Sequence, residues 1–206
     1  MTCERCARLC AFREENRKKY PSFFNAPVPN FGDEKAELLI VGLAPGLKGA
    51  NQTGRPFTND YAGDLLYPTL AKYGWAAGQY GKTATDGLRL TGAIITNAVR
   101  CVPPQNKVTG AEVNECLSYL KKTIKDLPNL KVVLSLGSVS HRSVLKAFGK
   151  RLADFPFGHG KVHRLADGLY LVDSYHCSRY NTNTGVLTTQ MFEDVFEEIQ
   201  KIIRHS

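Results

Sequence analysis

The sequence has no long run of apolar residues. A transmembrane helix needs about 18 or more consecutive, mostly apolar residues, and no stretch of this 206-residue chain approaches that length. The first residues, MTCERCARLC, are polar and lack the apolar segment of a secretory signal peptide. These absences argue against a membrane-spanning or secreted protein, so we expect an intracellular protein without membrane contact.

The chain also lacks linkers, shifts in composition and internal repeats. Its length suits one domain of ordinary size, and its 43% hydrophobic and 22% charged residues are typical of globular proteins. We therefore expect residues 1–206 to form a single domain.

Acidic residues are fewer than basic ones. Lysine and arginine together number 27 against 19 aspartates and glutamates, which gives a net charge of +8. An excess of this size favours a polyanionic partner, most simply DNA or RNA. A basic soluble protein without such a partner is the alternative reading.

Short apolar runs alternate with longer helical stretches along the chain. The four predicted strands are Glu37–Val41, Ala93–Asn97, Lys131–Leu136 and Leu169–Tyr175. The predicted helices are Tyr61–Tyr73, Gly110–Lys125, Ser138–Phe148 and Thr188–Arg204, with a charged helical stretch over Glu4–Lys19. Strands that are apolar at every position are buried on both faces. The pattern predicts an α/β fold, a three-layer α/β/α sandwich around a short, mainly four-stranded parallel sheet.

The carboxyl ends of these strands carry the unusual residues. They are Gly42, Asn97, Gly137 and His176. Because ligands of open α/β sheets bind at the carboxyl edge, we expect a binding site there. The first strand leads into a glycine-rich loop that contains Lys48 followed by Gly49 rather than Ser or Thr, which excludes a P-loop.

Three motifs near this edge resemble a known family. GLAPG (42–46), NQTGRPFT (51–58) and SYHCSRYNTNTG (174–185) are similar to the active-site motifs of uracil-DNA glycosylases, most closely the iron–sulfur branch called family 5 or B type. The resemblance extends from Cys3 to the last helix. It implies the uracil-DNA glycosylase fold and a monomeric, monofunctional glycosylase in the cytoplasm or nucleoid of a prokaryote. Such an enzyme flips uracil out of double- or single-stranded DNA and leaves an abasic site for base excision repair.

The cysteines form a spaced set. Cys3-x2-Cys6 opens the chain, and Cys101 and Cys116 lie far downstream. Four thiolates can hold zinc or a [4Fe–4S] cluster, and the wide spacing of the second pair favours the cluster. A buried, unligated Cys116 is the alternative. The resemblance implies a [4Fe–4S] cluster on these four residues. We expect its role to be structural, because glycosidic hydrolysis moves no net electrons, and Cys10 competes with Cys3 as a ligand if the N-terminus is frayed.

The resemblance also assigns the pocket. A flipped base needs an aromatic face, an amide that reads its edge and a donor for the charge on the leaving base. Phe57, Asn97 and His176 take these roles, and Gly42 and Ala44 complete the substrate site. Without the resemblance these three side chains fit a core phenylalanine, a turn or capping asparagine and a structural histidine. His159 is a further candidate close to the site.

The position after Gly42 is Leu43, which cannot activate water. Other glycosylase families have an acidic or amide residue there, whereas family 5 shares this departure. Asp60 is the nearest alternative, and it also fits a helix N-cap. We expect a dissociative reaction in which His176 stabilises the uracil anion and Asp60 favours the cationic sugar.

DNA contacts are expected on either side of the pocket. The resemblance implies that a loop after His176 grips phosphates and fills the gap left by the base; its residues are Ser178, Arg179, Tyr180, Asn181 and Thr184. Lys107, in the loop after Cys101, is a further phosphate contact. Cys177 stands where the family usually has proline.

Two alternatives stay open at this point. The same scaffold could accept other bases, such as hypoxanthine or hydroxymethyluracil. A catalytically silent, cluster-bearing DNA-binding protein is the other, because Leu43 and Cys177 depart from the glycosylase pattern.

Overall fold

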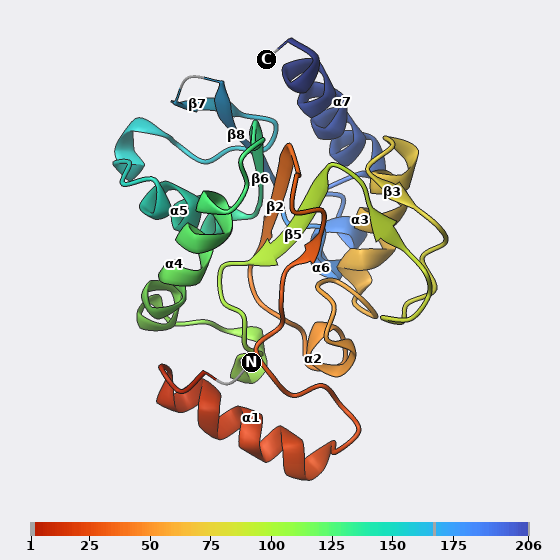
Figure 1. Cartoon of the computed structure of the whole chain (residues 1–206), viewed down its shortest axis with the longest axis vertical. Helices are drawn as coiled ribbons and strands as arrows, with labels where there is room; N and C mark the ends of the chain where they lie inside the picture. Colours follow the sequence, from red (N-terminus) through yellow and green to blue (C-terminus); the bar gives the residue numbers. More distant parts are fainter. Residues whose placement is uncertain (1–2, 167, 206) are drawn as a thin grey trace.

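A computed structural model describes residues 3–166 and 168–205 of the chain. Its centre is a six-stranded sheet with the order β1-β5-β2-β6-β8-β7 (Figure 1). The strands are β1 (Phe31–Gly32), β2 (Leu38–Gly42), β5 (Ala93–Asn97), β6 (Val132–Leu136), β7 (Val162–Ala166) and β8 (Leu169–Ser174). The four central strands are parallel, which confirms the predicted sheet, and the two edge strands pair antiparallel.

The central strands are mostly apolar and largely buried because helices cover both faces of the sheet. Every residue of β2, β5 and β6 is buried. In register, Leu38 lies between Ala93 and Val132, and Gly42 lies opposite Asn97. Both faces of these strands therefore contribute to the core, as a three-layer sandwich requires.

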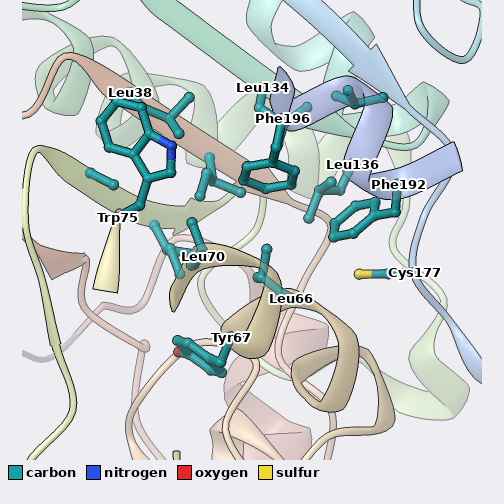
Figure 2. Close-up of a cluster of buried hydrophobic side chains, with 14 of the residues drawn as sticks. Leu38, Leu66, Tyr67, Leu70, Trp75, Leu134, Leu136, Cys177, Phe192 and Phe196 are labelled. Carbon is teal, nitrogen blue, oxygen red and sulfur yellow. The ribbon is translucent and has the colours of Figure 1, made fainter. Parts of the chain in front are cut away.

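Helices on the two sides of the sheet form the outer layers. Figure 1 shows α3 (Tyr61–Lys72) and α7 (Thr189–His205) on one side and α4 (Gly110–Lys125) and α5 (Ser138–Ala147) on the other. These four helices match the predicted ones to within one residue at each end. Figure 2 shows Phe192 and Phe196 of α7 packed above Leu66 and Leu70 of α3. None of the described helices is long and apolar enough to cross a membrane.

Several short elements were not predicted. They are α2 (Ala50–Thr53), α6 (Arg179–Asn183), the hairpin of β3 (Ala76–Ala77) and β4 (Arg89–Leu90), and the 3₁₀ turns Pro104–Asn106 and Leu152–Asp154. None of them is long enough to show a hydrophobic period. Contacts with other segments accompany three of them: β3 pairs with β4, Gln52 of α2 accepts the N–H of Phe24, and Asn183 of α6 accepts from the hydroxyl of Tyr61.

The first helix, α1 (Ala7–Lys19), lies apart from the sandwich, below the sheet in Figure 1. It begins three residues later than the predicted helical stretch. Leu9 is its buried apolar anchor and packs with Val99, Val113, Cys101 and Cys116 in a separate small core. A helix with so little apolar surface needs further attachment to the domain.

Candidate active site

A pocket of about 460 Å³ lies at the carboxyl edge of the sheet. Four segments line it: 43–46 after β2, 57–62 before and within α3, Asn97 with the 103–106 turn, and 176–179 after β8. The predicted residues that it brings together are Ala44, Phe57, Asp60, Asn97, His176, Ser178 and Arg179. Its volume is typical of small-molecule sites.

Gly42 lies directly behind the pocket wall. A Cβ at this position would collide with the amide oxygen of Asn97 and with the ring of Phe57. The missing side chain therefore lets the aromatic ring and the amide approach each other. Gly42 acts by leaving room rather than by lining the pocket.

Asn97 ends β5 with its side chain toward the pocket. The residue is buried, and within the described residues its amide makes no hydrogen bond to the protein. A turn or capping asparagine would use its side chain on nearby backbone groups. The amide of Asn97 instead has both a donor and an acceptor available to a ligand.

His176 follows β8 and faces Phe57 across the pocket, with ring centroids 6.2 Å apart. Burial lowers the pKa of its imidazole below the usual 6.5, so the ring is neutral at pH 7 and carries one N–H donor. The Asn181 amide donates to the backbone carbonyl of His176 (2.8 Å). Asn181 thus fixes the main chain that carries the imidazole.

Asp60 stands at the N-cap position of α3, but its carboxylate makes no capping hydrogen bond. The side chain turns instead to the glycine-rich loop, where the N–H of Ala50 donates to it (3.4 Å). A Cβ at Gly46 or Gly49 would collide with the carboxylate. Burial raises the pKa of Asp60 above its ordinary value, and the backbone donors of Ala50 and Gly46 counteract this only in part.

The loop after His176 is built around the short helix α6. Ser178 caps it by accepting the N–H of Asn181, and Thr184 donates to the carbonyl of Tyr180 (2.7 Å). The guanidinium of Arg179 lies over the ring of Tyr61, 5.2 Å from its centroid. Tyr180 is 73% exposed and points to solvent. Lys107 is exposed and outside the pocket lining, and DNA contact by any of these residues stays a prediction.

Cys177 is fully buried in the main core, and Figure 2 shows it beside Phe192. Burial raises the pKa of its thiol to about 12, so it is an unreactive, neutral side chain. The loop that lacks the family's proline is therefore anchored by packing.

The predicted cluster ligands lie in one region. Cys6, Cys101 and Cys116 pack around the same small core, and Cys3 interacts electrostatically with each of them. Burial first, and then the neighbouring thiolates, raises the pKa of Cys6 to about 11. Among the described residues, no three cysteine sulfurs all lie within 4.8 Å of one another.

Buried arginines surround these sulfurs. Arg13 donates to Cys101 Sγ (3.5 Å), to Cys10 Sγ (3.7 Å) and to the Cys3 carbonyl (2.8 Å). The backbone N–H of Arg100 donates to Cys116. The Nε atoms of Arg13 and Arg100 are buried without a partner in the described part of the chain. Such a cationic lining suits an anionic thiolate-held group, and Cys10 belongs to the lining as a contact of Arg13.

The structure also shows site residues that the sequence did not reveal. Pro103 and Asn106 line the pocket mouth, as do Tyr61 and Ala62 of α3. Asn106 has a left-handed φ of +57°, a conformation that asparagine tolerates better than most residues. Among these four residues, that preference is the local feature a sequence could offer. Elsewhere His141, His163 and Asp173 gather their ligand atoms within 4.8 Å. His141 and Asp173 already have hydrogen-bond partners on both sides, which ties the segment around Phe155–Gly158 to β8.

Comparisons with known proteins agree with the geometry. The family model of the uracil DNA glycosylase superfamily matches residues 29–200. A type-5 uracil-DNA glycosylase of Thermus thermophilus is 42% identical over 205 residues, which cover 97% of this chain and 93% of that protein. One of Mycobacterium tuberculosis is 38% identical over 210 residues, 97% of this chain and 78% of that protein. A type-4 enzyme of Archaeoglobus fulgidus is 33% identical over 140 residues, 67% of this chain and 62% of its own.

Proposed function

This chain belongs to the type-5 uracil-DNA glycosylases of the uracil DNA glycosylase superfamily, and from that premise we propose that it excises uracil from DNA. It hydrolyses the N-glycosidic bond and leaves free uracil and an abasic site, the first step of base excision repair. The observation that carries the proposal is the pocket itself. An aromatic ring, an amide and a neutral imidazole converge in it, and neither the amide nor the imidazole has a described hydrogen-bond partner within the protein.

Phe57 and Asn97 recognise the base. A base can reach this enclosed edge only after it has left the duplex stack. The flipped base stacks on the ring of Phe57, while Gly42 and Ala44 leave room for its edge. The amide of Asn97 can accept the N3–H of uracil and donate to O4 together. Cytosine presents the opposite pair of groups, so it would need the amide of Asn97 turned by 180°.

Bond breaking is driven by the leaving base. The C1′–N1 bond cleaves with its electron pair moving to uracil, which becomes an anion, while the sugar becomes an oxocarbenium-like cation. The single N–H of neutral His176 donates to the growing charge on uracil O2. A preorganised donor in a dry site is worth about 3–4 kcal/mol in comparable reactions. Water then adds to C1′, and its proton passes to solvent.

Asp60 acts on the cation rather than on the base. Leu43 lines the pocket but has no group that could orient water. Asp60 is the carboxylate of this lining, and its side chain is not used in capping the helix. Its negative charge and the DNA phosphates stabilise the cationic sugar, and it accepts the hydrogen bond of the incoming water.

The positive loops around the pocket hold the DNA. Arg179, Ser178, Asn181 and Thr184 lie beside the pocket on or around α6, and exposed Tyr180 fills the space left by the base. Lys107 contacts the backbone from the opposite side. The net charge of +8 supports such a phosphate-based interaction. The protein acts as a monomer.

We further propose a [4Fe–4S] cluster held by Cys3, Cys6, Cys101 and Cys116. The wide sequence spacing of Cys101 and Cys116 favours a cluster over zinc, and the buried cationic lining fits an anionic cluster. Thiols with raised pKa values become thiolates only when metal is bound. The cluster would join α1 to the turn at Pro103, which lines the pocket. Its role is structural, because glycosidic hydrolysis transfers no net electrons.

A cleavage assay tests the activity. The purified protein is incubated with a duplex that contains one uracil, and abasic sites are converted to strand breaks with alkali. We expect breaks at uracil and none in a matched duplex with thymine. A duplex with hypoxanthine in the same position measures the breadth of specificity. Binding without any strand break would establish the silent DNA-binding alternative.

A further inference from the structure

Phe57 has a backbone conformation that side-chain-bearing residues seldom adopt. Its φ is +55°, and Asn59, two residues on, has a φ of +60°. This left-handed region suits glycine and tolerates asparagine, but it is rare for an aromatic residue. Such conformations persist only where the surrounding structure holds them in place.

The segment that holds Phe57 is the loop of residues 78–88, which joins β3 to β4. The hydroxyl of Tyr80 accepts the N–H of Asn59 (3.1 Å) and donates to the carbonyl of Phe57 (3.3 Å). One side chain thus bonds the main chain on both sides of Thr58. Both left-handed residues depend on the same oxygen atom.

A buried ion pair fastens this loop to the stacking segment. Arg55 and Asp86 form two parallel hydrogen bonds of 2.7 Å, and each side chain is only 5% exposed. Asp86 also accepts the N–H groups of Gly81 (2.9 Å) and Leu88 (3.0 Å). Arg55 donates through Nε to the hydroxyl of Thr58 (2.6 Å). The pair therefore ties the loop to the two residues on either side of Pro56 and Phe57.

Packing around the ion pair leaves little freedom. The ring of Tyr80 lies against that of Tyr67, with centroids 4.6 Å apart, and the guanidinium of Arg55 lies 5.4 Å from the Tyr67 ring. Figure 2 shows Tyr67 on the side of α3 away from Phe196. Gly63 passes so close that a Cβ there would collide with the Phe57 carbonyl and lie 2.7 Å from the Tyr80 hydroxyl.

We infer that the 78–88 loop positions the base-stacking segment, with Tyr80 as the residue that fixes Phe57 and, three residues on, Asp60. The inference rests on the proposed function, because it assigns Phe57 to the flipped base. Tyr80 lies outside the pocket lining and contacts no substrate, so it is a positioning residue. The loop belongs to none of the motifs that the sequence analysis singled out.

The test compares Tyr80→Phe with wild type and with Tyr73→Phe. The first variant keeps the ring and removes both hydrogen bonds to the stacking segment. Tyr73 is the matched control, because its hydroxyl donates to Glu197 of α7 (3.1 Å), away from the pocket. We expect Tyr80→Phe to lower the single-turnover excision rate about tenfold. Binding of free uracil should weaken in the same variant, while affinity for abasic DNA stays within about twofold.

Two results would overturn the inference. One is an excision rate and a uracil affinity in Tyr80→Phe equal to those of Tyr73→Phe. The other is a loss of rate that parallels a loss of thermal stability and DNA affinity, which would make the hydroxyl a general stabiliser. If the wild type cleaved no uracil, the proposed function would fail instead. Uracil affinity and the exchange rate of the Asn59 amide would then still decide the positioning role, since both must change in Tyr80→Phe alone.

Discussion

Asp60 shows how a functional side chain can be costly to the fold. Its carboxylate lies between Gly46 and Gly49, where burial opposes the charge and raises its pKa. A carboxyl whose pKa is raised in the folded state destabilises the protein once the pH exceeds its ordinary value of 3.8. The cost is therefore absent in acid and grows as the pH rises from 3.8 through the raised pKa of the folded protein.

Asp60→Asn should for this reason stabilise the protein. The amide keeps the size and the acceptor oxygen of the side chain without the buried charge. We expect a gain of about 1 kcal/mol in the free energy of unfolding at pH 7, together with lost activity. The gain should shrink as the pH falls toward 4, since the wild-type carboxyl then becomes neutral. Chemical denaturation at several pH values measures it, and a variant less stable than wild type at pH 7 would contradict it.

Asn97 should set the preference for uracil. Asn97→Ala removes the amide that we propose pairs with the uracil edge but leaves Phe57 and His176 in place. Loss of matched hydrogen bonds at a buried edge costs about 1–3 kcal/mol, so uracil excision should fall. Hypoxanthine offers a similar N–H and carbonyl pair on a larger purine ring, which meets Asn97 in a different position, so its excision should fall less. Single-turnover rates on both substrates provide the ratio, and an unchanged ratio would mean that Asn97 does not read the base.

At the residue scale, the sequence predicts which residues belong to the site better than it predicts how their side chains are oriented. The N-cap position of Asp60 follows from the local pattern, whereas the turn of its carboxylate toward Gly46 and Gly49 depends on the folded loop. The role of Tyr80 depends on contacts with a segment more than twenty residues away. Cys177 departs from the family's proline, and only its burial beside Phe192 shows that the loop is still anchored.

Among the elements, α1 depends most on the proposed cluster. Apart from its ligand region, its contacts with the domain include Leu9, the ion pair of Arg8 with Glu112 (2.7 Å) and the hydrogen bond from Asn25 to the Asn16 carbonyl (3.4 Å). Arg8 also donates to the carbonyl of Lys107 (2.8 Å), in the turn next to the pocket. Release of α1 would therefore disturb the loop that carries Lys107.

Removal of a cluster ligand tests this attachment. Purified wild-type protein should contain about four iron atoms per chain. Cys101→Ala should lose the iron and expose α1 to proteolysis, whereas Cys10→Ala should retain it. Cys177→Ala is a second control, as a buried cysteine of the main core. Colourless wild-type protein with one zinc ion and no iron would contradict the cluster. Loss of iron in Cys10→Ala would move the ligand assignment away from Cys3.

Long elements were predictable because their signals are local. The apolar runs of the four parallel strands and the helical spacing of α7 lie within single stretches of sequence. β1 has only two residues, and it is a strand because it pairs with Ile94 and Ile95 of β5. β7 is mostly exposed at the sheet edge, so its sequence lacks a buried pattern. Pairing with β5 and with β8, rather than the β propensity of their own residues, defines the two edge strands.

In the whole molecule, the candidate site residues lie at the carboxyl edge of the sheet. Parallel strands bring the residues after β2, β5 and β8 together, so their convergence followed from the predicted topology. Nothing in the sequence placed Pro103, Asn106 or Tyr61 at the same pocket, because loops of the fold bring them there. With His176 neutral and Leu43 inert, the proposed mechanism places most of the catalysis in stabilisation of the leaving base.

The rank order of two variants tests this division of labour most directly. His176→Ala and Asp60→Ala are compared in single-turnover cleavage of uracil-containing duplex, where product release cannot mask the chemistry. Both should keep their DNA affinity, because phosphate contacts supply most of it. His176→Ala should lose more rate, by about 3–4 kcal/mol of transition-state stabilisation. If folded, DNA-bound Asp60→Ala is the slower enzyme, Asp60 is the essential base, and catalysis centred on the leaving uracil is wrong.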